Sequence, residues 1–316
     1  MTDGLIYMGG RMLMSGEAQV PVTSAGVKYG ANVFEGLCFY RSASGGGNVF
    51  RLREHLTRLQ QSIKIMRLDA AYSDIDFQQA IFQSLEANRI REDAHIRLSV
   101  IVVGEGSCDL RGPTSLVCTV SRRPPGDLAD RAIAACVSSW QRIGDLNLPP
   151  RIKAGPNYHN SRFALLDAQA NGYSEALLLN AAGKVSEATS ACFMMVREGR
   201  LITPPVTAGI LRSVTRGALL RLAQEKLSMP VDIREVDRTE VYTAEEAFLC
   251  SSFEEVRPII ALDRIQIGSG WVGPWTQRLW DCYEQVVRNV DESYGHWLTP
   301  LPHMAKTAAQ EPNSVA

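Results

Sequence analysis

Apolar and polar positions follow two spacings along this chain, one typical of helices and one typical of strands. In LREHLTRLQQSIKIMRL, residues 52–68, apolar side chains recur every three or four positions, which predicts an amphipathic helix. Ser73 or Asp74 and Ser213 precede similar stretches and are residue types that cap helices. The pattern predicts further helices over 73–90, 159–173, 213–227 and 274–290.

Short β-rich runs lie between these helices. LIYMGGRML, residues 5–13, is typical of a hairpin whose turn is Gly9–Gly10. Strands and helices therefore alternate over most of the chain, which favours a mixed α/β fold. The other predicted strands are 36–42, 48–52, 94–104, 114–121, 132–140, 175–180, 184–190, 191–199, 246–252 and 254–260.

One segment interrupts this alternation. RRPPGDLADR, residues 122–131, is charged, rich in proline and without periodicity, so we interpret it as a linker between two domains. This interpretation predicts a small α/β domain over 1–121 and a larger domain over 132–302. The tail from His303 is small and polar, and we expect it to be disordered.

Composition excludes several classes of function. The 33 basic residues balance 34 acidic ones, so no field of one sign attracts nucleic acid or a membrane surface. Apolar runs are too short to span a membrane, and the N-terminus is unlike a signal peptide. The seven cysteines are scattered without a CxxC pair, which is typical of reduced thiols in a cytoplasmic protein. The five histidines form no metal-ligand pair, so we expect no metal site.

Lys153 is the first residue whose setting indicates chemistry. It lies in RIKAGPNYHNSR, after a double proline and before a Gly155–Pro156 turn. A lysine that a rigid backbone holds and partly desolvates can form a Schiff base with an aldehyde. From this stretch alone, a lysine on a solvated loop is the favoured interpretation.

Two further features are compatible with a phosphorylated pyridine cofactor. Glu187, in GKVSEATSACF, lies among small residues, where a carboxylate needs a charged or hydrogen-bonding partner. The helix that starts at ILRSVTR offers the N–H groups of Val214 and Thr215 to an anion, although every helix has such an end. Arg58 and the pair Ser251–Ser252 could each add a phosphate contact, although taken singly they are more typical of a salt-bridge arginine and of serines in a turn. GxGxxG, P-loop, GxSxG and HExxH motifs are missing.

In combination these residues resemble a known family. YGANVFEGL, FRLREHLTRLQQSIKIMRL, KAGPNY, KVSEAT, LITPP and GILRSVTR, in this order, are similar to segments of the branched-chain amino acid aminotransferases. These are class IV, or fold-type IV, enzymes that use pyridoxal 5'-phosphate. The resemblance covers nearly the whole chain. It implies a small α/β N-terminal domain and a larger C-terminal domain with a β-barrel-like core.

The resemblance also implies a role for each matching residue. Lys153 corresponds to the lysine that forms the Schiff base with the cofactor and moves the Cα proton of the substrate. Glu187 corresponds to the partner of the pyridine nitrogen, and Tyr158 to a hydroxyl near the phenolic oxygen. The expected phosphate-binding residues are Arg58, Val214, Thr215 and Ser252, and the expected substrate pocket contains Tyr29, Phe34, His95, Arg97 and Phe253.

Some positions depart from the family pattern. The family commonly has a tyrosine in place of His95 and small residues in place of Phe253 and Glu254. We expect activity with L-glutamate and 2-oxoglutarate, because Arg97 can pair with a second carboxylate. We also expect an altered preference among leucine, isoleucine and valine.

Other reactions on the same fold stay open from the sequence. They are D-amino acid or (R)-amine transamination, the aminodeoxychorismate lyase reaction and cofactor binding without catalysis. An RxH pair of the kind that D-specific relatives carry is missing after HIRLSV, which favours L-amino acids. The loop 104–113 matches a segment that reaches the neighbouring subunit in the family. The implied partners are therefore small amino and 2-oxo acids and a second copy of the chain, in a homodimer or larger homo-oligomer.

Overall fold

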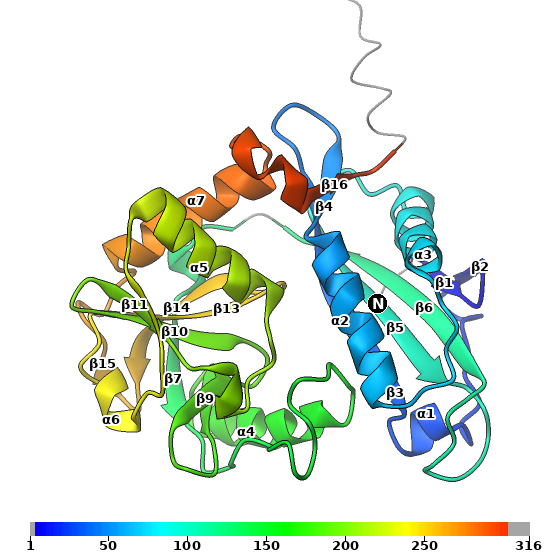
Figure 1. Ribbon diagram of the computed structural model, residues 1–316, viewed down its shortest axis with the longest axis horizontal. Coiled ribbons are helices and arrows are strands. Elements are labelled where there is room, and N and C mark those ends of the chain that lie inside the picture. Colours follow the sequence, from blue (N-terminus) through cyan, green and yellow to red (C-terminus); the bar gives the residue numbers. More distant parts are fainter. Residues whose placement is uncertain (1–3, 125, 303–316) are drawn as a thin grey trace, which may run out of the picture. The chain divides into compact units, whose positions relative to one another are not determined.

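The chain folds into two compact units, whose elements are labelled in Figure 1. The computed structural model describes residues 4–124 and 126–302, so the tail predicted from His303 lies outside the described residues. Unit 1 combines the chain up to 125 with the chain from 284 onwards, and unit 2 is 126–283.

The division differs in one respect from the domains expected from the sequence. The boundary near residue 125 falls inside the predicted linker, 122–131. Residues 284–302, which the sequence placed in the second domain, group with unit 1 instead. The physical reason is strand pairing, because Leu298 lies opposite Phe50 in an antiparallel ladder of the first sheet.

Unit 1 is built on a seven-stranded sheet of order β16-β4-β3-β5-β6-β1-β2. The central strands β3 and β5 pair antiparallel from Asn32 opposite Ile101 to Phe39 opposite Ala94. The predicted hairpin is confirmed, and Gly9 has the positive φ that its turn requires. The strands are β1 (Leu5–Met8), β2 (Arg11–Met14), β3 (Asn32–Arg41), β4 (Gly47–Phe50), β5 (Ala94–Val102), β6 (Thr114–Arg122) and β16 (Leu298–Pro300).

Two long helices pack against this sheet, α2 on β3 and α3 on β6 and β1 (Figure 1). Their apolar stripes face the strands, as the helical spacing predicted. Ser73 caps α3 in a reciprocal capping box with Asp76, which satisfies N–H groups that the helix itself leaves free. The helices of unit 1 are α1 (Ala25–Lys28), α2 (Leu52–Ile65), α3 (Asp74–Ala87) and the 3₁₀ helix η3 (Glu292–Trp297).

A carboxylate lies fully buried between the sheet and α2. Glu35 of β3 accepts two hydrogen bonds from Arg58, both at 2.7 Å, and its Oε2 lies 2.8 Å from His55 Nδ1. Burial alone raises the pKa of Glu35, but the Arg58 charge and the hydrogen bonds from Arg58 and His55 outweigh it and lower the pKa from 4.5 to about 2. The sheet therefore holds α2 through an ion pair as well as through apolar contacts.

Unit 2 contains a barrel. Eight strands of its nine-stranded sheet follow the order β12-β11-β10-β13-β14-β7-β8-β9, and β15 pairs with β14. Strand β9 also pairs back onto β10 between Glu187 and Cys192. This last pairing closes a ring and leaves β11, β12 and β15 outside it. The strands are β7 (Ile133–Val137), β8 (Glu175–Leu179), β9 (Val185–Ala188), β10 (Cys192–Arg197), β11 (Arg200–Thr203), β12 (Val231–Ile233), β13 (Glu246–Ser251), β14 (Glu255–Leu262) and β15 (Ile265–Gln266).

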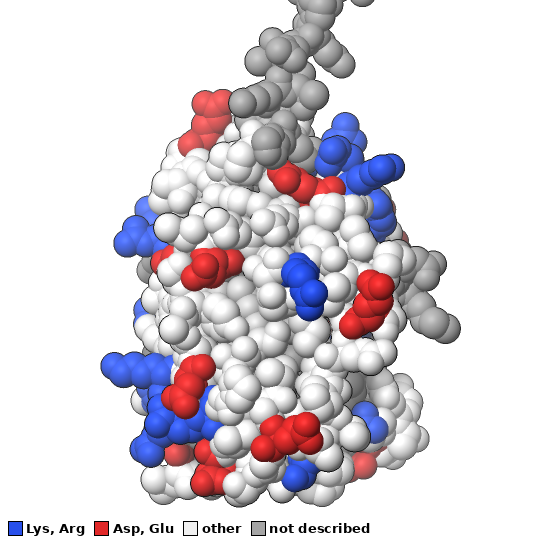
Figure 2. Space-filling view, turned by 90° about the vertical axis from the view of Figure 1, so that its right-hand side faces the viewer, with Lys and Arg blue, Asp and Glu red and all other residues white. Residues whose placement is uncertain are grey.

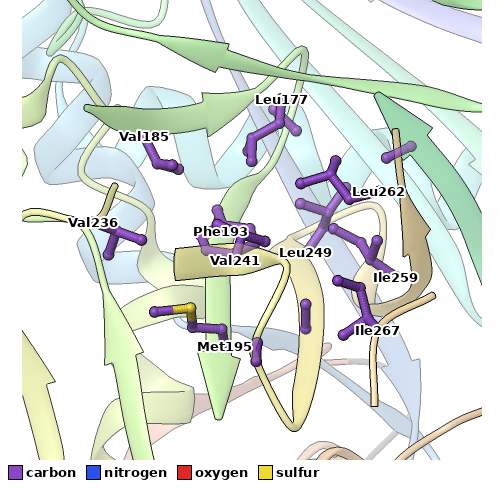
Figure 3. Packing of buried hydrophobic residues seen from close by; sticks show 14 of the residues in the cluster. Leu177, Val185, Phe193, Met195, Val236, Val241, Leu249, Ile259, Leu262 and Ile267 are labelled. Atoms are coloured by element: carbon purple, nitrogen blue, oxygen red, sulfur yellow. The ribbon is translucent and has the colours of Figure 1, made fainter. Parts of the chain in front are cut away.

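Every strand of the ring contributes to one apolar cluster, which Figure 3 shows from close by. Burial of such a side chain stabilises the fold by about 1.5–3 kcal/mol relative to exposure, so the cluster is the main source of barrel stability. Leu177, Val185, Phe193, Leu249 and Ile259 come from five different strands of the ring. The helices of unit 2 are η1 (Ala129–Arg131), α4 (Asn157–Ala170), η2 (Val206–Ala208), α5 (Val214–Leu227), α6 (Arg238–Val241) and α7 (Pro274–Val287), whose last residues belong to unit 1.

Charges of both signs are interspersed on the surface. Figure 2 shows lysine and arginine beside aspartate and glutamate on one face, with wide uncharged areas between them. Within the described ranges no helix has the length and apolar character needed to cross a membrane. Over the same residues, histidine, cysteine and acidic side chains form no group of three or more that could hold a metal ion.

Glu35→Gln should destabilise the protein by about 3–5 kcal/mol near neutral pH, because Arg58 is then buried without its counter-charge. The lowered pKa of Glu35 means that this stabilisation is complete above pH 4.5 and is lost as the pH falls toward 2. Urea unfolding at several pH values should therefore show a difference between variant and wild type that shrinks with acidification. Glu92→Gln, which breaks an exposed pair with Arg122, serves as a control with an expected loss below about 1 kcal/mol. A Glu35→Gln loss that does not vary with pH would contradict this account.

Candidate functional site

A cavity in unit 2 collects most of the chemistry expected from the sequence. Lys153, Tyr158 and Glu187 all line it, although they come from a loop, from α4 and from β9. The remaining lining residues are Arg142, Pro150, Ile152, Asn157, Ser161, Thr189, Ser190 and Leu211.

The loop that carries Lys153 is fixed at several points. Ile152 and Ala154, on either side of the lysine, are buried. Asn157 donates through Nδ2 to the carbonyl oxygens of Pro149 (2.9 Å) and Ile152 (3.1 Å). The Asn157 Oδ1 atom is also buried, and it has no hydrogen-bond partner within the described residues. The backbone around Lys153 is therefore held without any contact to the amine itself.

The lysine amine and the tyrosine hydroxyl meet directly. Lys153 Nζ donates to Tyr158 Oη at 2.6 Å. The two residues are brought together because α4 starts at Asn157, so that Tyr158 lies on its first turn beside the loop. Both side chains are half-buried, so the pair is open to the cavity and largely shielded from bulk water.

Glu187 is buried, and donors surround its carboxylate. Arg142 Nη2 lies 2.5 Å from Oε1, and both side chains are less than a tenth exposed. The backbone N–H of Leu211 donates to Oε2 at 3.1 Å, and the Cys192 thiol lies 3.7 Å from the same oxygen. Burial raises the pKa of Glu187, while the Arg142 charge, the Leu211 N–H and the Lys153 charge oppose the increase.

Arg142 was not recognised from the sequence. It also donates to the Gly209 carbonyl at 3.2 Å and to Ser161 Oγ at 3.4 Å. The sequence around Arg142, WQRIGD, contains no motif that indicates a functional role, and its partner Glu187 is distant in the chain. Only the folded barrel places the two residues in contact, so no local signal could have found this arginine.

Val214 and Thr215 are the first two residues of α5, as predicted. Ser213 is the N-cap, and its side chain accepts from the Arg216 N–H at 3.1 Å. Arg216 is itself buried and donates to Thr203 Oγ1 and to the Pro204 carbonyl. The first N–H groups of a helix have no intrahelical partner, so this fixed helix start presents N–H donors to an anion.

The other predicted residues lie apart from the cavity lining. Ser252 and Phe253 lie in the turn between β13 and β14, and the Phe253 side chain is 58% exposed. Arg58 lies in unit 1, where it pairs with Glu35.

Three of the predicted substrate-pocket residues of unit 1, Phe34, His95 and Arg97, lie on the neighbouring strands β3 and β5 of its sheet. His95 and Arg97 of β5 alternate with Ile96 and Leu98, which are fully buried on the face toward the helices. On the opposite face the Arg97 guanidinium stacks on the Phe34 ring, 3.6 Å from its centroid. Tyr29, the C-cap of α1, is 46% exposed.

Gly36 leaves the room that His95 occupies. A Cβ atom at Gly36 would lie 2.9 Å from His95 Nε2, closer than real Cβ contacts allow. Gly36 is also the cross-strand neighbour of Arg97. His95 and Arg97 therefore project to the same face of the sheet.

Comparison with known proteins identifies the family. Residues 32–262 match the family model described as amino-transferase class IV. The chain belongs to the class IV aminotransferases. The branched-chain-amino-acid aminotransferase of Salmonella typhimurium is 34% identical over 305 residues, which cover 94% of this chain and 97% of that one.

Solved structures agree with this result. A branched-chain aminotransferase from the archaeon Thermoproteus uzoniensis, crystallised with norvaline, has a TM-score of 0.89 at 35% identity and covers 94% of this chain and 99% of its own. The holo-form of the Thermobaculum terrenum branched-chain amino acid aminotransferase, with PLP, has a TM-score of 0.88 at 39% identity and covers 95% and 98%. The resemblance and the fold class inferred from the sequence are therefore confirmed.

This class IV enzyme is an aminotransferase that uses pyridoxal 5'-phosphate. The residues of the cavity fit such a cofactor. The cavity offers an amine, a hydroxyl beside it and a buried carboxylate that can meet a protonated ring nitrogen. The buried Asn157 Oδ1 also lacks a donor among the described residues.

Arg142→Met should leave Glu187 buried without a cation and destabilise the cofactor-free protein by about 3–5 kcal/mol at neutral pH. The folded-state pKa of Glu187, already raised, should rise further, so the loss should be small at acidic pH and grow as the pH increases. Urea unfolding across the pH range measures this. The control is Arg200→Met, which breaks a half-exposed pair with Asp232 and should cost about 1 kcal/mol or less. A loss that decreases with rising pH would contradict the argument.

Proposed function

We propose that this enzyme transfers amino groups between an L-amino acid of the branched-chain or a related apolar type and a 2-oxo acid such as 2-oxoglutarate. The names of the relatives support this substrate class. The observation that carries the proposal is the meeting of Lys153, Tyr158 and Glu187 around one cavity. These are the residues that the family resemblance assigned to the cofactor.

Pyridoxal phosphate, when bound, supplies an aldehyde that condenses with amines and a ring that accepts electrons from the substrate Cα. Lys153 is the amine of this chain that holds the cofactor and, once released, accepts and returns the Cα proton. A lysine serves as a base only when its amine is deprotonated. The fixed loop keeps the amine at one place, so little ordering is required at each proton transfer.

Tyr158 controls the amine through their shared hydrogen bond. With Lys153 Nζ 2.6 Å from Tyr158 Oη, the hydroxyl orients the amine and can donate to its lone pair when the amine is neutral. When the amine moves toward a substrate proton, the hydroxyl stays at the cavity wall on α4. We assign it the position beside the phenolic oxygen of the cofactor.

Glu187 provides the negative charge that keeps a ring nitrogen protonated. Arg142 favours its ionised form, and Leu211 N–H does the same from the other oxygen. The charge is thus maintained in a dry site, where it acts over a short distance with little screening. We assign the phosphate to the start of α5, at Val214 and Thr215, with Ser252 as a further ligand.

The assignments to residues of unit 1 stay predictions. They are Arg58 for the phosphate, and Tyr29, Phe34, His95 and Arg97 for the substrate. The stacking of Arg97 on Phe34 supports a substrate role, because it presents a charged group beside an apolar ring. Such a surface suits ligands that have either a carboxylate or an apolar side chain. The assignment of Phe253, which is exposed in the β13–β14 turn of unit 2, to the substrate stays a prediction as well.

We also propose that the enzyme acts in the cytoplasm as a homodimer or larger homo-oligomer. The loop 104–113, which the family resemblance assigned to the neighbouring subunit, supports this assembly. Its Gly106 carbonyl accepts from Lys28 Nζ at 3.0 Å, so the loop is tied to α1. Sedimentation velocity at assay concentration measures the state directly, and a fully active monomer would refute the proposal.

Lys153→Ala should abolish transamination and remove the visible absorbance of the protein incubated with pyridoxal phosphate. The reason is that the variant lacks the amine that condenses with the aldehyde. Lys184→Ala, at a half-buried lysine paired with Asp237, is the control and should keep both colour and activity. The assay pairs L- or D-leucine with 2-oxoglutarate, and L- or D-glutamate with the 2-oxo acid of leucine, and each donor is also tested without an oxo acid. A colourless wild-type protein, or turnover that needs no oxo acid, would sink the proposed function.

Arg97→Ala should lower kcat/KM for L-glutamate far more than for apolar donors, by about 1.5–3 kcal/mol if a charged hydrogen bond is lost. Steady-state kinetics with glutamate and leucine in both proteins give the comparison. The control for charge removal is Arg41→Ala, because Arg41 is an exposed arginine at the end of β3. An equal loss for both donors would show that Arg97 only supports the fold.

A further inference from the structure

Three side chains form a row across the barrel of unit 2. Cys192 of β10 lies directly opposite Glu187 of β9 and also directly opposite Cys250 of β13. Residues that face each other in antiparallel pairs project to the same side of the sheet. The exposed fractions of Glu187, Cys192 and Cys250 are 5%, 2% and 0%, so these three residues are largely inaccessible to solvent.

The sulfur of Cys192 has two acceptors within reach. Its Sγ lies 3.7 Å from Glu187 Oε2 and 3.5 Å from the Leu211 carbonyl oxygen. The Leu211 N–H donates to the same Oε2 at 3.1 Å, so cysteine, glutamate and the loop before α5 meet at one point. An ionised carboxylate only accepts hydrogen bonds, so between Cys192 and Glu187 the thiol is the donor.

The thiol keeps its proton in this setting. Burial raises the pKa of Cys192 well above 9, and the nearby charge of Glu187 raises it further. A thiolate is the form that reacts with electrophiles and oxidants, and this environment suppresses it. The contacts therefore suit a permanent hydrogen-bond donor rather than a nucleophile.

We infer that Cys192 is a positioning residue of the aminotransferase, whose thiol donates to Glu187 Oε2 and fixes the orientation of that carboxylate. The inference rests on the role proposed above for Glu187.

The importance of this contact follows from the number of hydrogen-bond donors around the Glu187 carboxylate. A carboxylate offers about four lone-pair sites. Arg142, the Leu211 N–H and the Cys192 thiol fill three of them, so about one remains for a proton on a cofactor nitrogen. The S–H group is a weak hydrogen-bond donor, so Cys192 restrains the orientation of the carboxylate but neutralises little of its negative charge. Without the thiol, the carboxylate loses one of the two donors that hold Oε2.

Infrared spectroscopy can detect the hydrogen bond from Cys192 to Glu187 without enzymatic turnover. The S–H stretch falls in an otherwise empty spectral region, and a stronger acceptor shifts it to lower frequency. Difference spectra against Cys192→Ala assign the band of this thiol, and Cys192→Ser gives the same assignment if the alanine variant folds poorly. Glu187→Gln should then shift the Cys192 band to higher frequency, because a neutral amide is a weaker acceptor than a carboxylate.

Cys250 is the matched control in the same row. Its Sγ lies 3.9 Å from Met194 Sδ, so its band should stay in place in Glu187→Gln. A Cys192 band that is unchanged by Glu187→Gln would show that the thiol donates to the Leu211 carbonyl, and the inference would be wrong. This result does not depend on turnover, so it is distinguishable from a failure of the proposed function.

The holoenzyme provides the second measurement. Cys192→Ala should lower kcat by about tenfold, a change that corresponds to about 1.4 kcal/mol, with a smaller change in KM. It should also shift the pH titration of the visible absorbance, because the titration senses the carboxylate at the ring. Cys192→Ser should recover most of the rate, and Cys250→Ala should leave the rate and the titration unchanged. An unshifted titration in Cys192→Ala, or an equal loss in Cys250→Ala, would reduce Cys192 to a packing residue.

Discussion

The ion pair between Arg142 and Glu187 is the constraint on which the site of unit 2 depends. A carboxylate that is 5% exposed is costly unless a cation and hydrogen-bond donors surround it. Arg142 supplies the cation, and it also bonds Gly209 and Ser161. One guanidinium therefore joins β9 to α4 and to the loop that leads into α5. The parts of the proposed cofactor site are fixed relative to each other by the same interaction that keeps Glu187 charged.

Unit 1 contains a comparable arrangement. Glu35 is fully buried, and Arg58 and His55 of α2 hold it, so a helix is attached to a strand through a carboxylate. The pKa shifts differ in direction, since that of Glu35 falls to about 2 while that of Glu187 rises. The difference follows from the charge of the donors, because Glu35 receives two charged hydrogen bonds from Arg58. Among the three groups that contact the Glu187 carboxylate, only Arg142 is charged. Glu187 is thus the carboxylate with spare capacity for another positive partner.

The ability of Glu187 to accept a further positively charged partner relates the structure of the site to the aminotransferase reaction. A class IV aminotransferase needs an amine that gains and loses a proton and a carboxylate that does not. Tyr158 and the fixed loop serve the amine of Lys153, whereas Arg142, Leu211 and Cys192 serve the carboxylate of Glu187. The two groups line one cavity, yet separate sets of contacts control them. The charge of Lys153 also favours the ionised form of Glu187, so a change at the amine affects the carboxylate directly.

Local sequence determined the helices, their caps at Ser73 and Ser213, the Gly9–Gly10 hairpin and the family, because spacing, capping and short motifs act over a few residues. Motifs were also enough to select Lys153 and Glu187. Only tertiary structure decided that Arg142 is the partner of Glu187 and that Leu298 pairs with Phe50. The same holds for Cys192, which meets Glu187 only where β9 closes the barrel onto β10. These contacts join segments far apart in the chain, and such pairings follow from the closed sheet and the buried charges rather than from any local pattern.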